Sequence, residues 1–305
     1  AGGYYVSGIT NFPCVITSPD AITWTQTAIP AAASSTITRI AFGNGRFVAG
    51  TRLGTDQIFY SSDGLTWSIS ASTSPFQMRG LAYGNGKWVA VCALGIFPSY
   101  FTSTDNGATW TTGADQSSVF SGATDLFFYN GVFIATTRTG KIVTSVDGIT
   151  WTLSADLQTL LSSVPIAGIT FGNNTFCAIS TGGGIVISSD LTNWTLVQAA
   201  YTSPTYAFND IDFFNGRFIA VGRENSGATQ TTVVLTSIYG TNWILYDTDV
   251  PVASLTPADQ SLANGNNTSV IINTLSTGTY EALYSYSAPL QNVYASGIYS
   301  DPNNI

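Results

Sequence analysis

A short motif ending in tryptophan recurs along this 305-residue chain, and its spacing limits what the chain can fold into. In the clearest copies, residues 61–67, 103–110 and 145–151, Ser, Asp, Gly and Thr precede the tryptophan in the same order. Together with altered copies, the motif ends at Trp24, Trp67, Trp110, Trp151, Trp194 and Trp243, in steps of 43, 43, 41, 43 and 49 residues. The chain is therefore built from internal repeats, each the size of a small supersecondary unit.

A second motif keeps the same period about twenty residues before each tryptophan, at 41–49, 82–90, 128–135, 171–178 and 213–220. Most of its copies centre on Asn-Gly between two apolar runs, a strong hairpin signal because a tight turn needs positive φ at both central positions. In the first full repeat we predict strands at 37–42, 46–51, 57–61 and 65–70. They are joined in turn by the Asn-Gly turn, a variable loop and an Asp-Gly turn. Four strands in a repeat of this length are typical of a β-propeller blade.

The number of blades depends on how the two ends of the chain are interpreted. Residues 1–305 are predicted to form a single domain, a seven-bladed β-propeller of four-stranded antiparallel blades with about 43 residues each. The first repeat lacks its first strand, and a spare apolar segment at 292–299 could supply it. The ring would then close by pairing the C-terminal strand with the N-terminal one, which removes two open sheet edges. Six blades with an extra N-terminal hairpin are the alternative.

Composition excludes several kinds of partner and chemistry. Only 9% of residues are charged, and 17 acidic against 9 basic residues give a net charge of −8. No basic stripe is present to neutralise phosphates, so we expect no nucleic-acid partner. No run of eighteen apolar residues occurs, so we expect no membrane insertion. The chain has no histidine, which removes the usual general base and most zinc sites, and we expect neither metal nor cofactor.

The tryptophan motif resembles the Asp-box, Ser-x-Asp-x-Gly-x-Thr-Trp, of the BNR-repeat or sialidase-like propellers. Residues 103–110 match this pattern in full, and the copies ending at Trp67 and Trp151 are one residue shorter. In that family the box is a folding element between the third and fourth strands. The resemblance therefore implies a structural role for Asp20, Asp63, Asp105, Asp147 and Asp190 and for the six tryptophans Trp24, Trp67, Trp110, Trp151, Trp194 and Trp243. An Asp side chain can accept hydrogen bonds from turn amides, and a Trp can bury a large area between blades.

Strand direction separates a structural face from a variable one. The Asn-Gly and Asp-Gly turns emerge on one face of the disc, and all connections of variable length emerge on the other, where binding is expected. Candidate ligand-binding residues on the variable face are Arg52, Arg138, Arg223, Tyr100, Tyr201 and Tyr206. The three arginines follow the second strand in alternate repeats and bring to mind the sialidase arginine trio. Independent surface arginines are the favoured interpretation, and a capping role is the alternative for each tyrosine.

We expect a non-catalytic binding or structural module that recognises a glycan receptor, a protein receptor or other virion proteins through this variable face. Low charge and Ser-, Thr- and Asn-rich repeats resemble those of phage tail, fibre and decoration proteins and bacterial surface propellers, which suggests an extracellular or virion-surface location.

The alternative is a sialidase-like carbohydrate-active hydrolase with Asp210, Asp212 and Glu224 as its acids, because glycoside hydrolysis needs two carboxyl groups. Alignment of the repeats on the turn asparagine places Arg39, Asp125 and Asp210 at one position, five residues earlier and near the channel.

Overall fold

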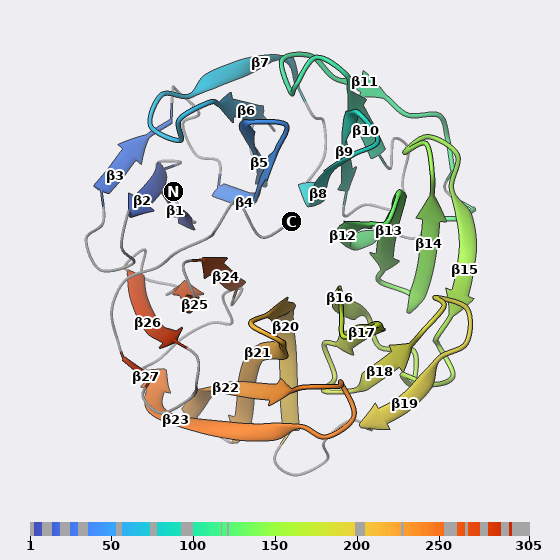
Figure 1. Ribbon diagram of the computed structural model, residues 1–305, viewed down its shortest axis with the longest axis vertical. Coiled ribbons are helices and arrows are strands. Elements are labelled where there is room, and N and C mark those ends of the chain that lie inside the picture. Colours follow the sequence, from blue (N-terminus) through green and yellow to red (C-terminus); the bar gives the residue numbers. More distant parts are fainter. Residues whose placement is uncertain are drawn as a thin grey trace.

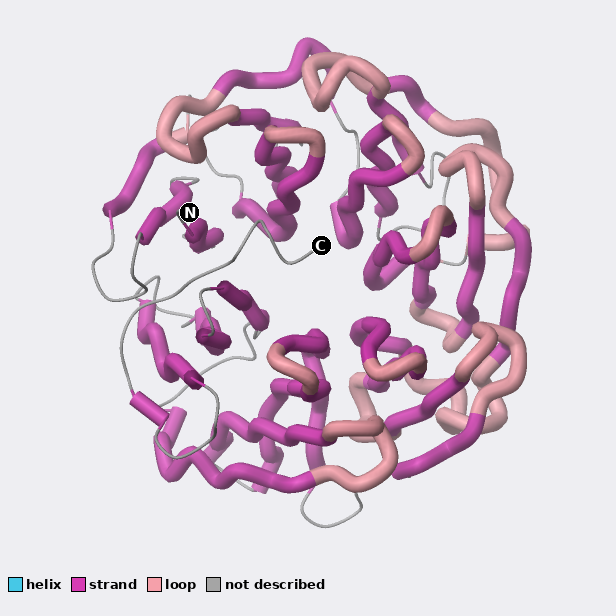
Figure 2. The backbone as a smooth tube through the Cα atoms, in the orientation of Figure 1, coloured by secondary structure: helices cyan, strands magenta, loops and turns pink. Residues whose placement is uncertain are grey.

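The computed structural model describes the central repeats almost continuously and strands from both ends. The described residues are 3–7, 14–18, 25–29, 36–52, 57–73, 78–92, 100–116, 118–120, 122–198, 205–226, 229–252, 261–265, 268–274, 280–287 and 293–294. All regular structure in these ranges is β-strand, as Figure 2 shows, so none of them contains a helix that could cross a bilayer.

Seven antiparallel sheets stand around a central channel, and we number them as blades 1 to 7 along the chain (Figure 1). Blade 1 has three described strands, β1 (Gly3–Ser7), β2 (Cys14–Ser18) and β3 (Thr25–Ala28). Blade 2 comprises β4 (Thr36–Gly43), β5 (Arg46–Arg52), β6 (Gln57–Ser61) and β7 (Ser68–Thr73). Blade 3 comprises β8 (Met78–Gly84), β9 (Lys87–Cys92), β10 (Tyr100–Ser103) and β11 (Thr111–Thr112). Blade 4 comprises β12 (Ala123–Tyr129), β13 (Val132–Thr137), β14 (Lys141–Ser145) and β15 (Thr152–Asp156).

The remaining blades repeat this plan. Blade 5 comprises β16 (Ile166–Gly172), β17 (Thr175–Ser180), β18 (Ile185–Ser188) and β19 (Thr195–Gln198). Blade 6 comprises β20 (Thr205–Phe214), β21 (Arg217–Ser226), β22 (Thr229–Ser237) and β23 (Ile244–Val252). Blade 7 comprises β24 (Ser261–Gly265), β25 (Thr268–Thr274), β26 (Tyr280–Ser287) and β27 (Val293–Tyr294). In each four-stranded blade the strands pair in chain order, with the first strand nearest the channel. The predicted all-β propeller of four-stranded antiparallel blades is therefore confirmed.

Two details differ from the sequence prediction. The fourth strand of blade 2 was expected at 65–70 but begins at Ser68, because the preceding residues are held in a hydrogen-bonded turn. The described part of the spare C-terminal segment, Val293–Tyr294, pairs with β26 as the outer strand of blade 7. The expected pairing of that segment with the N-terminal strands is therefore not found among the described residues.

The turn that delays the fourth strand is built by an aspartate. In blade 2 an Asp63 carboxylate oxygen accepts bonds from the amides of Leu65 at 2.8 Å and Thr66 at 2.7 Å, and from the Ser61 hydroxyl at 3.0 Å. These amide bonds favour the ionised form and lower the pKa of Asp63. Equivalent bonds are made by Asp105, Asp147 and Asp190.

The tryptophan that ends each turn packs against the preceding blade. Trp67, 5% exposed, lies in a cluster with Val15 of blade 1, and Trp110, 8% exposed, lies in a cluster with Val48 of blade 2. Trp151 joins blade 4 to blade 3 in the same way. The hydrophobic core is thus divided into separate clusters, one at each of these junctions between blades. One sequence repeat supplies the residues that lead from one junction to the next. Asp20 and Trp24 lie outside the described residues.

Candidate functional site

A β-bulge occurs at the same position in five consecutive inner strands and aims side chains toward the channel. The strand pairing shifts between Ile37 and Arg39, Met78 and Gly80, Ala123 and Asp125, Ile166 and Gly168, and Phe208 and Asp210. The residues skipped by the pairing are Thr38, Arg79, Thr124, Ala167 and Asn209. A bulge redirects the side chain of the extra residue, and bulges are common beside functional sites.

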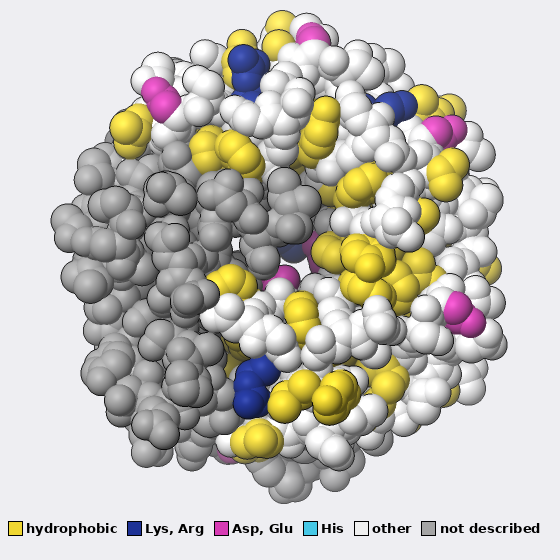
Figure 3. Space-filling view, in the orientation of Figure 1, with side chains coloured by type: hydrophobic (Ala, Val, Ile, Leu, Met, Phe, Trp, Pro, Cys, Tyr) yellow, Lys and Arg dark blue, Asp and Glu magenta, His cyan; other side chains and the backbone are white. Residues whose placement is uncertain are grey.

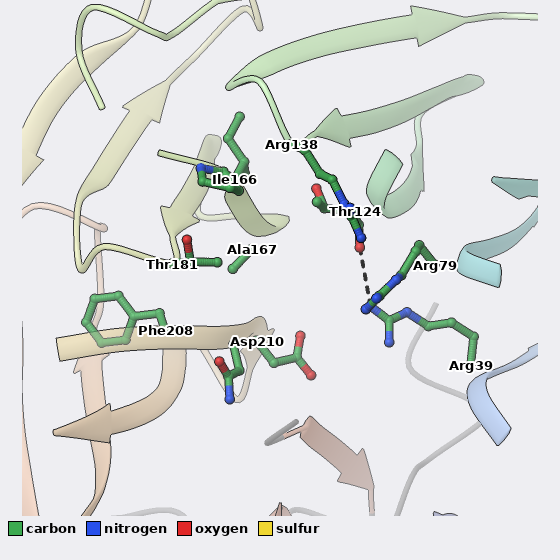
Figure 4. Close-up of a pocket in the computed structure, with 11 residues that line it drawn as sticks. Arg39, Arg79, Thr124, Arg138, Ile166, Ala167, Thr181, Phe208 and Asp210 are labelled. Atoms are coloured by element: carbon green, nitrogen blue, oxygen red, sulfur yellow. Dashed lines mark hydrogen bonds between the residues drawn. The ribbon is translucent and has the colours of Figure 1, made fainter. Parts of the chain in front are cut away.

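Four of these five bulge residues line one cavity of about 340 Å³ at the channel. The channel is open in the space-filling view, where acidic and basic side chains are visible inside it (Figure 3). Arg39, Arg79 and Arg138 contribute to the cavity from blades 2, 3 and 4, and Phe208 and Asp210 from blade 6. In Figure 4 the ends of the three arginine side chains gather on one side of the cavity, with Asp210 and Phe208 on the opposite side. Arg138 directly follows β13, so the cavity lies toward the variable face.

Arg39 is held by the channel wall. Arg39 donates a 3.3 Å bond from its guanidinium to the carbonyl oxygen of Thr124, which joins the inner strand of blade 2 to that of blade 4 (Figure 4). The neighbouring Asp125 accepts a bond from the amide of Leu126 in its own strand at 2.9 Å, and one from the amide of Ile169 at 3.3 Å that ties blade 4 to blade 5. Burial raises the pKa of Asp125, and the positive charge of Arg39 acts in the opposite direction.

Positively charged side chains are scarce in this chain, and the cavity brings several of them together. The chain has only 9 Lys and Arg residues, and three of them line this one cavity. Asp210 is the one acid among the described lining residues. A guanidinium presents planar paired donors that fit a carboxylate, so this arrangement favours an anionic group. No cluster of acidic or cysteine side chains that could hold a metal occurs in the part of the chain that the structure describes.

The predicted ligand-binding residues are distributed unevenly. Arg138 lines the cavity, whereas Arg223, on β21, is not among its lining residues. The side chain of Arg52 and the whole of Tyr201 lie outside the described residues. Of the two predicted arginines whose side chains the structure describes, Arg138 therefore lies at the channel site and Arg223 does not.

The two described tyrosines belong to the core instead of the rim. Tyr100 is fully buried, with its ring 6.3 Å from that of Phe120, and its hydroxyl accepts a bond from the Ala114 amide at 3.2 Å. Tyr206 is 7% exposed and packs between blades 5 and 6. Both rings are thus inaccessible to a ligand at the surface, and the capping alternative describes them better. Both lie at or next to the start of a strand, where a loop residue and a core residue look alike in sequence.

The acids proposed for the hydrolase alternative are not gathered at one place. Asp210 lines the cavity. Asp212 accepts a 3.4 Å bond from the Thr170 hydroxyl and so links blades 5 and 6. Glu224 lies on β21, opposite Tyr206 in the strand pairing, and is not among the cavity-lining residues.

Sequence reasoning did not assign a binding role to Arg39 and Arg79. Arg39 shares its aligned position with Asp125 and Asp210, as predicted, and that position does lie at the channel. Arg79 occupies the bulge, one residue earlier, where the alternation of buried and exposed positions breaks. That break is the signal in the sequence that could have found it.

Comparison with known proteins identifies an architecture. No protein-family model matches the chain, and a search of curated proteins finds no match. Among solved structures, YCF48 bound to D1 peptide is similar at a TM-score of 0.65 and 17% identity, over 94% of this chain and 88% of that one. YCF48 from Cyanidioschyzon merolae gives 0.58 and 16%, over 88% and 91% of the two chains, and Saccharomyces cerevisiae Sqt1 gives 0.60 and 8%, over 96% and 84%. These neighbours are β-propellers, and at such identities the likeness shows the fold alone.

Proposed function

We propose that this protein is a non-catalytic binding module whose channel cavity takes a carboxylate-bearing peptide segment of a partner protein. The observation that carries the proposal is the convergence of Arg39, Arg79 and Arg138, from three successive blades, on one cavity. Three guanidinium groups within one recess can bind a carboxylate with paired hydrogen bonds. The partly exposed side chains of Pro165 and Ala167 in the same cavity can contact the aliphatic part of the bound segment.

The charge of the whole chain makes this site selective. With a net charge of −8, the protein repels acidic partners in general. An acidic segment is favoured only where the arginines outnumber the acids, and the cavity lining has three arginines and one aspartate. The site should therefore bind weakly in high salt and more tightly in low salt.

Binding without catalysis agrees with the acids that are present. Hydrolysis of a glycoside needs two carboxyl groups placed across the scissile bond. Asp210 is the one acid in the described cavity lining, and the nearby Asp125 is already bonded to two backbone amides. A propeller of similar shape, YCF48, has been solved with a bound peptide, which supports a peptide as ligand.

The setting we propose is the exterior of a cell or the surface of a virus particle, with a receptor or another particle protein as the partner. The sparse charge and the Ser-, Thr- and Asn-rich repeats motivate this placement. Mass spectrometry of purified particles and of surface-labelled cells tests it. Recovery of the protein only from the soluble interior of cells would refute it.

The binding site can be tested with short acidic peptides. Fluorescence anisotropy would compare a labelled peptide carrying a free C-terminal carboxylate and acidic side chains with a neutral, amidated peptide of the same length. We expect Arg79→Gln and Arg138→Gln each to weaken binding of the acidic peptide about tenfold or more, as for the loss of a charge-assisted bond. Arg217→Gln is the matched control, because it removes one positive charge from the opposite, turn face.

Four results would contradict the proposal. The first is equal binding of both peptides, and the second is binding that is insensitive to the two cavity arginines. The third is arginine-dependent binding of sialyllactose in place of peptide, which would move the ligand class to acidic glycans. Release of a sialoside leaving group that is lost in Asp210→Asn would favour the hydrolase instead.

A further inference from the structure

The channel cavity carries opposite charges on its two sides. The guanidinium ends of Arg39, Arg79 and Arg138 gather on one side, and Asp210 lies on the other (Figure 4). The arginines come from blades 2, 3 and 4, whereas Asp210 belongs to β20 of blade 6. A ligand that fills the space between them therefore meets a positive surface at one end and a negative surface at the other.

Two acids share the position after the bulge, and only one of them lines the cavity. Asp125 of blade 4 is committed to the wall, because its two oxygens accept the amides of Leu126 and Ile169. Asp210 accepts the amide of Ile211 at 2.9 Å with one oxygen, and it is a lining residue, which Asp125 is not. An ionised carboxylate can accept about four hydrogen bonds, so Asp210 can bond to the wall and to a ligand together.

The strand that carries Asp210 holds this carboxylate in one place. Phe208 is fully buried and Ile211 is 4% exposed, and both pack in the junction between blades 5 and 6. The residues on either side of Asp210 are therefore anchored, and the Ile211 amide restrains the carboxylate itself. A charged group on a packed strand keeps its direction, which discrimination between ligands requires.

We propose that Asp210 is a specificity-determining residue, and that the cavity selects a segment with a lysine or arginine close to the carboxylate that the three arginines bind. This inference rests on the proposed function and adds a second charge to its ligand. Without a cation nearby, Asp210 repels the bound carboxylate. A basic side chain of the same segment replaces that repulsion with a charge-assisted hydrogen bond, so Asp210 acts for one ligand and against others.

The size of the cavity limits the distance between the two charges of the ligand. A volume of about 340 Å³ is near the lower end of the range for ligand pockets, roughly 300 to 1,000 Å³. An extended segment advances about 3.3 Å per residue, so the basic residue should lie within about three residues of the carboxylate.

Compensation of the arginine charges is the alternative role for Asp210. In that case, removal of its charge strengthens the binding of every carboxylate ligand by the same factor, whatever the other side chains of the ligand. The selective role predicts opposite signs instead. Removal of the charge should weaken binding of a segment with a lysine beside the carboxylate and strengthen binding of the same segment with a neutral side chain.

Pairs of short peptides distinguish these two roles. Each peptide has a free C-terminal carboxylate, no acidic side chain, and a lysine one, two or three residues before its end. Its partner has acetyl-lysine at the same position, which keeps the aliphatic stem and removes the charge. By fluorescence anisotropy, we expect at least one lysine peptide to bind about tenfold more tightly than its partner. In Asp210→Asn, which keeps an oxygen for the Ile211 amide, this preference should disappear.

A matched control is needed because the chain as a whole is negative. With a net charge of −8, the protein attracts any cationic peptide to some extent. Glu224→Gln removes one negative charge from β21, the strand paired with β20, and Glu224 does not line the cavity. This variant should keep the preference for lysine. Arg79→Gln should weaken both peptides of a pair, because both carry the carboxylate.

The outcomes separate this inference from the proposed function. Equal binding within every pair, with all peptides weakened by Arg79→Gln, refutes the role of Asp210 and leaves the carboxylate site standing. A preference for lysine that persists in Asp210→Asn, or that is lost equally in Glu224→Gln, also refutes it. If no peptide binds, or if binding does not depend on Arg79, both proposals are wrong. Thermal unfolding checks that Asp210→Asn folds, and Asp210→Ser replaces it if it does not.

Discussion

Removal of the Asp147 carboxylate is expected to destabilise the protein by about 1 kcal/mol near neutral pH. Two amide bonds, from Ile149 at 2.8 Å and Thr150 at 2.7 Å, and one hydroxyl bond from Ser145 at 2.9 Å end on a single oxygen of this side chain. Partial burial acts against ionisation, but these bonds outweigh it and lower the pKa of Asp147 from 3.8 to about 2. That difference corresponds to at most about 2.4 kcal/mol, which solvent screening at this exposed turn reduces to about 1 kcal/mol.

The pH dependence follows from the direction of the shift. The pKa of Asp147 is lower in the folded chain than in the unfolded chain. Between these two pKa values the folded chain therefore binds fewer protons than the unfolded chain, so acidification favours unfolding. The stabilisation is fully present above the unfolded value of 3.8 and is lost as the pH falls through the folded value of about 2. Near pH 3, about half of it should remain.

Urea unfolding of the wild type, Asp147→Ala and Asp147→Asn near neutral pH and near pH 3 measures both effects. Asp147→Asn keeps an oxygen acceptor without a titratable charge, so its deficit relative to wild type should shrink as the pH falls. Asp156→Asn is a control, because Asp156 accepts a single turn amide bond, from Gln158. A deficit for Asp147→Asn that stays constant or grows on acidification would refute the assignment of stability to the ionised carboxylate.

Two further predictions concern the blade junctions. Gly84→Ala should lower the free energy of unfolding by about 1 to 3 kcal/mol, because its Cβ overlaps the Phe128 ring and overpacking strains a filled core. Denaturant unfolding measures this, and an unchanged free energy would show that the Phe128 ring does not need the space at Gly84. Cys177 is fully buried, and burial raises the pKa of its thiol, so it should react with a thiol reagent only after unfolding, as Cys92 should. Rapid labelling of either cysteine in the folded protein would show that these junctions open.

Most of the fold could be predicted from the repeat because its two motifs mark physical necessities of every blade. The Asn-Gly pair supplies a tight turn, and the Asp and Trp supply a turn acceptor and an interblade wedge. The start of β7 could not be predicted as well, because β-propensity continues through Leu65 and Thr66 while the Asp63 bonds hold their amides in the turn. Local hydrogen bonds from a side chain to backbone amides can override the β-propensity of the residues in the turn.

The candidate site was harder to predict for a geometric reason. Alignment correctly brought Arg39 and Asp210 toward the channel, because both follow the bulge at a fixed distance from the turn. Arg138 was found because it directly follows a strand. Tyr100 and Tyr206 were misplaced because an aromatic residue at a strand start can turn inward, and sequence alone does not give that rotation. Arg79 was missed because a bulge changes the side-chain alternation by one residue.

The proposed cavity site follows from the repeat architecture. In a repeat fold, positions that close junctions between blades must satisfy the same packing in every copy, so their residues vary little from blade to blade. The bulge position does not have this constraint: it holds Thr38, Arg79, Thr124, Ala167 and Asn209, which have no common size or charge. The position before the turn asparagine is a glycine in blades 2, 3 and 5, where a Cβ would overlap a ring of the next blade, and it is Tyr129 in blade 4 and Phe214 in blade 6. Comparison of one blade with another within a single chain therefore identifies where side chains are free to meet a ligand, even without a related sequence.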